Sequence, residues 1–244
     1  MKRHVLITGG SRGIGAAAVE VFARSGDHVS FFYKREHKKA EELVQKMTDE
    51  EKSVFAYAVD ITNRKSFDHA IQEIEKDRGT VDIFISNAGI ALQGLLTDVS
   101  EVEYRLQMDT HLTSLFYGSQ AVLPGMIAKK KGCILAVSSI WGITGASCEV
   151  VYSAAKAGVN GFVKALAKEV GPSGITVNAI APGMVDTDMM ADFNESERIE
   201  LQNETPLGRF GEPGEIAELL YFLASKNAEF ITGQIISPNG GIVM

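Results

Sequence analysis

The stretch VLITGGSRGIG, residues 5–15, joins a short apolar run, a glycine-rich turn and the start of an amphipathic helix over residues 16–25. A continuous apolar run bounded by glycines is typical of a strand that is buried on both faces. In this order the glycines let the backbone approach a pyrophosphate, and the helix N-terminus offers unpaired N–H groups and a favourable dipole. The stretch therefore predicts a nucleotide phosphate site at the first strand-to-helix junction of an α/β fold.

Apolar runs and helical patterns alternate along the rest of the chain. Strands are predicted over residues 28–33, 54–59, 81–86, 133–137, 175–180 and 233–237, and helices over 37–51, 64–78 and 215–224. A long helical region covers residues 101–131, with His111 and Pro124 as break points, and a further helix carries Tyr152 and Lys156. Six or seven such units predict a doubly wound, Rossmann-type parallel sheet of about seven strands with helices on both faces. We expect one domain, residues 1–244, with a substrate loop over about 182–212, because a connection of that length is more often a lid than a linker.

The bulk composition narrows the function classes. The chain has 244 residues and a net charge of −7, so we expect no nucleic-acid partner, and no apolar run reaches membrane-spanning length. Cys133 and Cys148 form no CxxC pair, which predicts free thiols in a reducing cytoplasm. The five histidines show no paired ligand spacing, so we expect no metal site.

Three residues form a candidate catalytic set. Tyr152 and Lys156 stand four apart in a helical segment, which places their side chains on one face. Ser139 ends the apolar run 133–137 and lies thirteen residues before Tyr152. A hydroxyl, a phenol and an ammonium that meet at one point can move a proton on or off a carbonyl oxygen.

The end of the second strand bears on the cofactor. An acidic residue there would hold a ribose 2′-hydroxyl, whereas basic residues accommodate a 2′-phosphate. Tyr33 is neutral, Lys34 is basic and Arg12 lies in the glycine turn, so the sequence favours NADPH over NADH. Alternatively, Lys34 and Arg35 only begin the solvated, lysine-rich helix that follows.

Several motifs together resemble one family. TGGSRGIG at 8–15, NAG at 87–89, Ser139, YSAAK at 152–156 and PG at 182–183 are similar in order and spacing to the short-chain dehydrogenase/reductase pattern over essentially the whole chain. Within that family the chain looks most like the 3-oxoacyl-acyl-carrier-protein reductases. The segment SSIWGITGASCEVVYSAAKAG, residues 138–158, is similar to a branch associated with reducing the 5-aminopentanone modification on translation elongation factor P.

The resemblance implies a catalytic trio, Ser139, Tyr152 and Lys156, and a set of cofactor contacts. It implies that phosphates and adenosine ribose contact Gly9, Ser11, Arg12 and Ile14, that adenine lies between Asp60 and Ile61, and that Asn87, Ala88 and Gly89 back the cofactor. It places the carboxamide end at Val185 and Thr187, next to Pro182 and Gly183, and the nicotinamide ribose at Tyr152 and Lys156. The positive charge of Lys156, together with that of the oxidised cofactor, is expected to stabilise phenolate and so to lower the pKa of Tyr152. The resemblance also implies a homotetramer.

The chain departs from the family pattern in places that concern its substrate and proton path. His111 stands where the family usually has asparagine: either it joins the proton relay, adding an acidic limb near pH 6.5 to the rate profile, or it packs in a helix break. Lys129, Lys130 and Lys131 either help to bind acyl carrier protein or only follow a helix dipole, and the 171–173 turn lacks the second basic position. Glu149 either meets a cationic substrate such as an aminoketone or is a solvated carboxylate.

Three functions remain open on the sequence. The first is an NADPH-dependent reductase of a ketone presented on a carrier, either a 3-oxoacyl thioester on acyl carrier protein or an aminopentanone on elongation factor P. The second is a carbonyl reductase or alcohol dehydrogenase for free small molecules. The third is a cofactor-sensing regulator without catalysis, against which the intact set of Ser139, Tyr152 and Lys156 argues.

Overall fold

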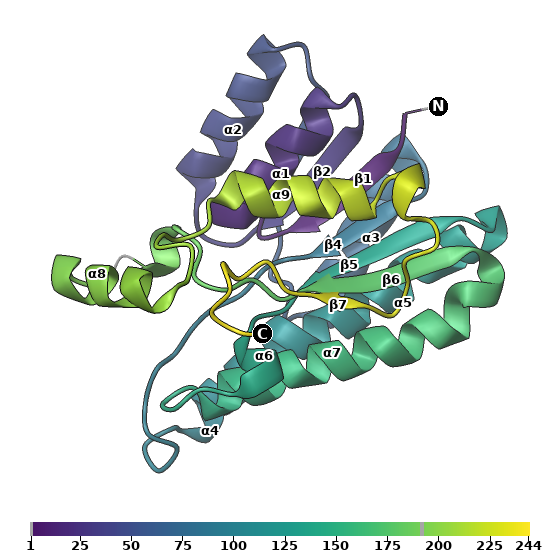
Figure 1. Cartoon of the computed structure of the whole chain (residues 1–244). Coiled ribbons are helices and arrows are strands. Elements are labelled where there is room, and N and C mark those ends of the chain that lie inside the picture. Colours follow the sequence, from purple (N-terminus) through teal and green to yellow (C-terminus); the bar gives the residue numbers. More distant parts are fainter. Residues whose placement is uncertain (1, 191–192) are drawn as a thin grey trace.

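The computed structural model describes residues 2–190 and 193–244, so Met1 of the predicted domain and residues 191–192 of the predicted substrate loop lie outside the described residues. Seven strands form one sheet (Figure 1). The strands are β1 (His4–Thr8), β2 (His28–Tyr33), β3 (Val54–Ala58), β4 (Ile83–Ser86), β5 (Gly132–Val137), β6 (Ile175–Ile180) and β7 (Ile235–Ile236).

The strand order confirms the predicted doubly wound topology. The sheet runs β3-β2-β1-β4-β5-β6-β7, and every pair of neighbours is parallel. The direction of winding reverses between β1 and β4. Ligands of open α/β sheets bind at the carboxyl ends of the strands beside such a reversal. The topology therefore directs attention to the segments that follow β1, β4 and β5.

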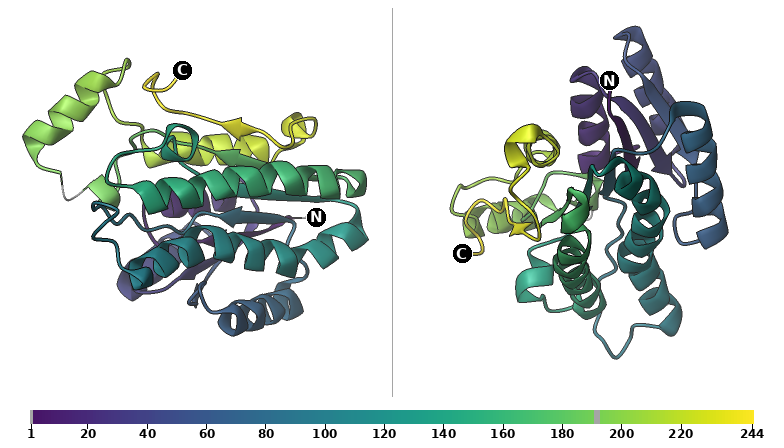
Figure 2. Two further views of the ribbon diagram at one scale, coloured as in Figure 1. Left: turned by 90° about the horizontal axis from the view of Figure 1, so that it is seen from below. Right: turned by 90° about the vertical axis from the view of Figure 1, so that its right-hand side faces the viewer.

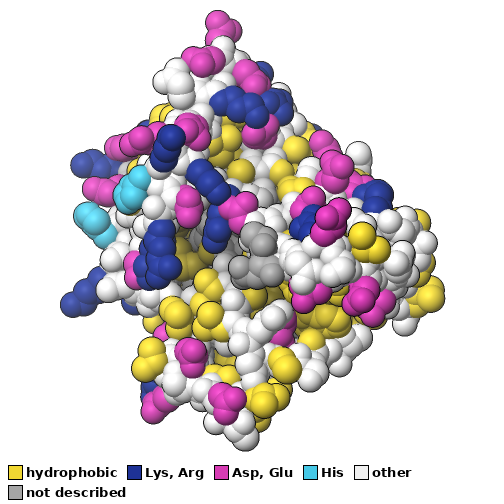
Figure 3. Space-filling model, turned by 90° about the vertical axis from the view of Figure 1, so that its left-hand side faces the viewer, with side chains coloured by type: hydrophobic (Ala, Val, Ile, Leu, Met, Phe, Trp, Pro, Cys, Tyr) yellow, Lys and Arg dark blue, Asp and Glu magenta, His cyan; other side chains and the backbone are white. Residues whose placement is uncertain are grey.

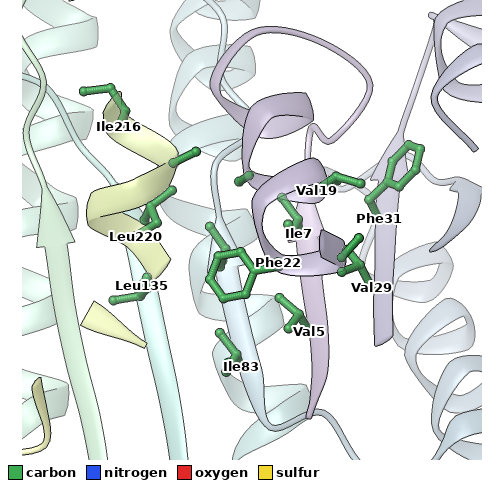
Figure 4. Packing of buried hydrophobic residues seen from close by; sticks show 14 of the residues in the cluster. Val5, Ile7, Val19, Phe22, Val29, Phe31, Ile83, Leu135, Ile216 and Leu220 are labelled. Carbon is green, nitrogen blue, oxygen red and sulfur yellow. The ribbon is translucent and has the colours of Figure 1, made fainter. Parts of the chain in front are cut away.

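Two layers of helices cover the sheet. On one face lie α1 (Gly13–Arg24), α2 (His37–Asp49) and α9 (Pro213–Leu223), and on the other lie α3 (Arg64–Arg78), α5 (Ser114–Lys129) and α7 (Val150–Val170). Figure 2 shows the same layers from two further sides. Side chains of β1 alternate between the two cores: Val5 and Ile7 pack under α1 with Phe22 (Figure 4), and Leu6 packs on the opposite face. This alternation is the period of two that a strand buried on both faces requires.

The long predicted helix over 101–131 is divided once. It consists of α4 (Glu101–Met108), a π-helical turn (Asp109–Thr113) and α5. The turn contains His111, so that predicted break point is confirmed, whereas the break at Pro124 is wrong because Pro124 lies inside α5. Proline removes one N–H from a helix, and buried Val122 and Met126 on either side hold α5 against the sheet.

The predicted connection over 182–212 is not a continuous loop. It contains a 3₁₀ turn (Asp188–Met190) and α8 (Glu195–Glu204), which stands away from the sheet in Figures 1 and 2. Asn194 and Glu197 form a reciprocal capping box at the start of α8. That pattern was the sequence signal for this helix. A second unpredicted helix, α6 (Trp141–Thr144), is a single turn after β5.

Gly118 sets the distance between α5 and the sheet. A Cβ at this position would overlap Cζ of Phe84 on β4. We expect Gly118→Ala to lower the free energy of unfolding by about 1–3 kcal/mol, because the ring must move within a packed core. Chemical denaturation would measure the loss. Gly214→Ala in α9 is the matched control, since its Cβ would meet nothing within 4 Å, and an equal loss there would contradict the packing argument.

In the described part of the chain, no helix has the combination of length and apolar character that crossing a bilayer demands.

Candidate active site

Ser139 is held where β5 ends beside β6. The backbone N–H of Ser138 donates to the carbonyl of Ile180 at 2.7 Å, and that of Ile140 donates to the carbonyl of Pro182 at 3.1 Å. The Oγ atom of Ser139 accepts a hydrogen bond from the backbone N–H of Trp141 at 3.2 Å. Strand pairing on either side therefore fixes the Ser139 hydroxyl at the carboxyl edge of the sheet.

Tyr152 and Lys156 reach the same edge from α7. Nζ of Lys156 donates to the carbonyl of Val137, the last residue of β5, at 2.8 Å. The same Nζ lies 5.5 Å from the centre of the Tyr152 ring. Gly142 of α6 makes this packing possible, because a Cβ there would lie 2.7 Å from the carbonyl carbon of Lys156. The structure thus brings the phenol and the ammonium together beside the strand end that carries Ser139.

Burial controls the protonation of this trio. It raises the pKa of Tyr152 to about 12, while the neighbouring Ser139 hydroxyl lowers that pKa and the Glu149 carboxylate raises it. Burial also lowers the pKa of Lys156 to about 7. Among the groups of the protein itself burial dominates, because desolvation disfavours the charged phenolate. A phenol with a pKa of about 12 is a proton donor at neutral pH. The lowering of this pKa by Lys156 together with the charge of an oxidised cofactor stays a prediction.

His111 lies against Tyr152 from the π-helical turn. The two rings meet edge to face, with centroids 5.1 Å apart and planes at 86°. Nε2 of His111 is 2.8 Å from the carbonyl oxygen of Ile90, so Nε2 carries the proton. Nδ1 is buried and has no hydrogen-bond partner among the described residues. A π turn within an α-helix often marks a functional position, and here it points an imidazole at the candidate phenol.

The predicted acidic limb from His111 is not supported. Burial, and then the neighbouring Lys156, hold the pKa of His111 well below its ordinary value. The imidazole is therefore neutral near pH 6.5. We expect wild type and His111→Asn to show the same shape of rate profile between pH 5.5 and 8, even if their maximal rates differ. A limb near pH 6.5 that only the wild type shows would contradict this.

The glycine turn packs directly on the segment that follows β4. Gly9 has φ +67°, and a Cβ on it would lie 2.8 Å from Cα of Ala88. Nδ2 of Asn87 donates to the carbonyls of Thr8 at 3.0 Å and Gly9 at 3.1 Å. Two motifs predicted to contact one cofactor, residues 8–15 and 87–89, are therefore adjacent in space.

The start of α1 suits a phosphate group. Arg12 is its N-cap residue, and in the described part of the chain no side chain caps this end and no acidic residue lies in the first turn. Gly13 has φ +54°, a conformation that favours glycine, and its Cβ would lie 3.3 Å from Cγ2 of Thr187. Free helix N–H groups beside a cation fit an anionic cofactor group. The residues present therefore fit the diphosphate of a dinucleotide.

The predicted pair of Arg12 and Lys34 does not share a partner. Nζ of Lys34 lies 2.6 Å from Oδ2 of Asp60. Arg12 instead faces Oδ2 of Asp188 at 3.4 Å, and Lys39 of α2 contacts the same oxygen at 2.7 Å. Lys39 and Asp188 were missed on the sequence because Lys39 reads as one of several solvated helix lysines and Asp188 is distant in the chain.

The other predicted cofactor residues vary in exposure. Four of them are buried: Ser11, Ile61, Pro182 and Val185. The others are partly exposed: Ile14, Asp60, Asn87, Ala88, Gly89, Gly183 and Thr187. Ile61 packs in the core under α3 and Val185 in the core under α9. Their side chains therefore support the edge of the sheet, and their cofactor contacts stay predictions.

Glu149 is the N-cap residue of α7 and lies near enough to Tyr152 to act on its pKa. Nε2 of Gln93 donates to its carboxylate at 3.1 Å. Burial raises the pKa of Glu149, while Gln93 lowers it. The backbone N–H of Gly94 donates to the carbonyl of Cys148, a residue with φ +61°. The segment after β4 and the turn before α7 thus meet beside Tyr152, and Gln93 is a member that sequence reasoning missed.

The lysine run, residues 129–131, lies at the amino ends of the strands, opposite the end that carries Ser139. Lys129 ends α5, before β5 begins, whereas Ser139 follows the end of β5. Nζ of Lys129 also contacts Oδ1 of Asp82 at 2.7 Å. A six-residue strand spans about 20 Å, so within one chain this run cannot touch a ketone held at Ser139.

Comparison with known proteins places this geometry in a family. Residues 9–243 match the family model described as Enoyl-(Acyl carrier protein) reductase. The chain is 42% identical to the "Uncharacterized oxidoreductase YmfI" of Bacillus subtilis over 99% of each chain. It is 41% identical to the 3-oxoacyl-[acyl-carrier-protein] reductase FabG of Vibrio cholerae, over 98% of this chain and 96% of the relative, and 39% identical to FabG of Chlamydia muridarum, over 99% and 98%.

The relatives cover the glycine turn, the strand ends and the residues that converge on them. The sheet order, the Tyr152–Lys156 pair on α7 and the full-length matches all agree. The chain is an oxidoreductase and belongs to the short-chain dehydrogenase/reductase family.

Proposed function

We propose that this protein is an NADPH-dependent ketone reductase, most like a 3-oxoacyl-[acyl-carrier-protein] reductase, with Tyr152 as the general acid. One observation carries the proposal: Lys156 of α7 is hydrogen-bonded to the end of β5, so that Tyr152 and the Ser139 hydroxyl lie beside each other at the carboxyl edge of the sheet. Full-length relatives named as 3-oxoacyl-[acyl-carrier-protein] reductases support the substrate class.

The chemistry follows from the protonation of the trio. When bound, a reduced nicotinamide supplies a hydride to the carbonyl carbon. Tyr152 is protonated at neutral pH and gives its proton to the carbonyl oxygen as negative charge develops there. Ser139 donates a hydrogen bond to the same oxygen. Protonated Lys156, whose Nζ lies 5.5 Å from the centre of the Tyr152 ring, supplies positive charge beside the phenolate that remains.

A first experiment separates an enzyme from a cofactor-sensing regulator. We expect the purified protein to oxidise NADPH in the presence of a simple 3-ketoester, and to oxidise NADH more slowly. The absorbance of the reduced nicotinamide measures the rate. Binding of NADPH without turnover of any ketone would favour the regulator. If turnover is seen, 3-oxoacyl carrier protein should then give a higher kcat/KM than the free ester.

A second candidate substrate is a ketone that carries an ammonium group, such as an aminopentanone on a protein. Glu149 supports this candidate, because its carboxylate acts on the pKa of Tyr152 and is only partly solvated. A cation bound there would compensate the carboxylate for its lost hydration. We expect Glu149→Gln to lower kcat/KM for an aminoketone by about tenfold, the size of one charge-assisted contact.

The neutral ketoester is the control for this variant. Its kcat/KM should stay within about twofold, since it offers no cation for Glu149 to bind. Equal losses of kcat/KM on the two substrates would mean that Glu149 maintains the structure around Tyr152 rather than selecting substrates that carry a positive charge. A direct comparison of 3-oxoacyl carrier protein with ketone-modified elongation factor P then decides between the two carriers.

We also propose that the protein is a homotetramer. Large apolar side chains are exposed on neighbouring helices: Val102 on α4, Phe116 and Ile127 on α5, and Val150 on α7. Such side chains on one region of a protein are typical of an interface. Light scattering after size exclusion should give four times the mass of the chain, and a monomer at micromolar concentration would contradict this.

A further inference from the structure

Asp188 joins two cations that come from different parts of the fold. Its Oδ2 lies 2.7 Å from Nζ of Lys39 on α2 and 3.4 Å from Nη1 of Arg12 at the start of α1. All three side chains are about half exposed. Lys39, and then Arg12, hold the pKa of Asp188 below its usual range. Figure 3 shows the side of the molecule on which α2 and α8 lie, where basic side chains alternate with carboxylates.

The second cation that the sequence suggested is engaged elsewhere. Lys34 pairs with Asp60, the residue after β3, at 2.6 Å. Beside the glycine turn, Arg12 and Lys39 therefore converge on one anion, and that anion is a carboxylate of the chain itself. A phosphate monoester carries more charge and more acceptor oxygens than a carboxylate, so it can displace the carboxylate from such a pair.

We propose that Lys39, rather than Lys34, is the partner of Arg12 in binding the cofactor's 2′-phosphate, and that Asp188 occupies this cation pair until the phosphate replaces it. The inference rests on the proposed use of NADPH. It assigns specificity for the phosphate to α2 and makes the 3₁₀ turn at 188–190 a competitor that leaves the cations when the phosphate binds.

The turn that carries Asp188 can release this carboxylate from Arg12 and Lys39 by a local movement. Its preceding residue, Thr187, lies close to Gly13 of the glycine turn. A separate ion pair, from Arg198 of α8 to Asp186 at 2.8 Å, holds the same segment without using Arg12 or Lys39. Release of Asp188 therefore leaves the segment attached through Arg198, so the exchange needs only a local movement.

Binding of nucleotide fragments tests the inference without turnover. Adenosine 2′,5′-bisphosphate and AMP differ only in the 2′-phosphate, and calorimetry at low ionic strength can measure the affinity for each. We expect Lys39→Gln to lower the affinity for the bisphosphate by about tenfold and the affinity for AMP by less than about twofold, the size of one charge-assisted contact. Lys34→Gln should change the two affinities alike, because Lys34 pairs with Asp60.

Asp188→Asn tests the competition. This variant should bind the bisphosphate about threefold more tightly and AMP with unchanged affinity, because Arg12 and Lys39 lose their carboxylate partner. Asp186→Asn is the matched control, since its partner is Arg198, and it should leave the ratio of the two affinities unchanged. Thermal melting of each variant verifies that it is folded.

Two results would overturn the inference. One is that Lys34→Gln lowers the affinity for the bisphosphate as much as Lys39→Gln does, or more. The other is an Asp188→Asn variant that binds the bisphosphate no better than wild type. A wild-type protein that does not distinguish the bisphosphate from AMP would instead refute the proposed use of NADPH, and the inference with it.

Discussion

Replacing Tyr152 with phenylalanine should reduce ketone reduction by about a thousandfold, the scale of a lost general acid. The substitution removes one hydroxyl from a buried ring and leaves its edge-to-face contact with His111 in place. Neither titratable neighbour in the described structure can replace it, because Nε2 of neutral His111 is bonded to the carbonyl of Ile90 and Nζ of Lys156 to that of Val137. Steady-state rates with NADPH and a 3-ketoester measure the loss.

Cofactor binding separates a chemical role of Tyr152 from a structural one. Tyr152→Phe should bind NADPH within a few-fold of wild type, since the glycine turn and the start of α1 are unchanged. Tyr57→Phe, on β3, is the control and should retain full activity. Near-normal turnover by Tyr152→Phe would refute the assignment of the general acid.

Replacing Ser139 with alanine should lower kcat by about a hundredfold or more, the usual result of losing a donor to a developing oxyanion. The serine hydroxyl accepts a hydrogen bond from the N–H of Trp141, which leaves its own hydrogen free to donate. The backbone on either side is fixed to β6, so the variant should keep its fold. The affinity for NADPH should change little, and kcat should carry the loss.

Ser138 provides the matched control. It is a buried serine one residue earlier, and its Oγ donates to the backbone carbonyl of Lys156 at 3.3 Å. Ser138→Ala should lower stability by about 1 kcal/mol, a typical single hydrogen bond, with a much smaller effect on rate. Equal kinetic losses in the two variants would mean that the segment, rather than the Ser139 hydroxyl, matters for catalysis.

Much of the fold could be predicted from local sequence. Strands buried on both faces produce continuous apolar runs, and the runs at residues 5–7 and 133–137 correspond to β1 and β5. Glycines at 9 and 13 indicated the turn that the structure places at positive φ. The helices α6 and α8 were missed: one turn is too short to show a period, and the capping box at Asn194 was overlooked within a polar segment.

The residues of the candidate site could be predicted from the sequence. The effect of burial on their pKa values could not. Spacing alone indicated that Tyr152 and Lys156 share a helix face, and β5 brought Ser139 to them. Burial raises the pKa of Tyr152 and lowers that of His111, so it opposes both the expected phenolate and the expected acidic limb. Desolvation depends on every element packed around a group, which a local pattern does not contain.

The sequence by itself determined the order of the strands and of the helices that cover the sheet, the glycine turn proposed for phosphate, and the candidate trio Ser139, Tyr152 and Lys156. Each of these depends on residue type and short-range spacing. Only the tertiary structure decided which charges meet: Lys34 with Asp60, Arg12 and Lys39 with Asp188, and Gln93 with Glu149. Arg12, Lys34, Asp60 and Glu149 were each singled out on the sequence, but not as members of these pairs. Lys39, Asp188 and Gln93 had no signal in the chain. Long-range ion pairs are set by how loops from distant strands fold over one sheet edge, and no local sequence pattern encodes that meeting.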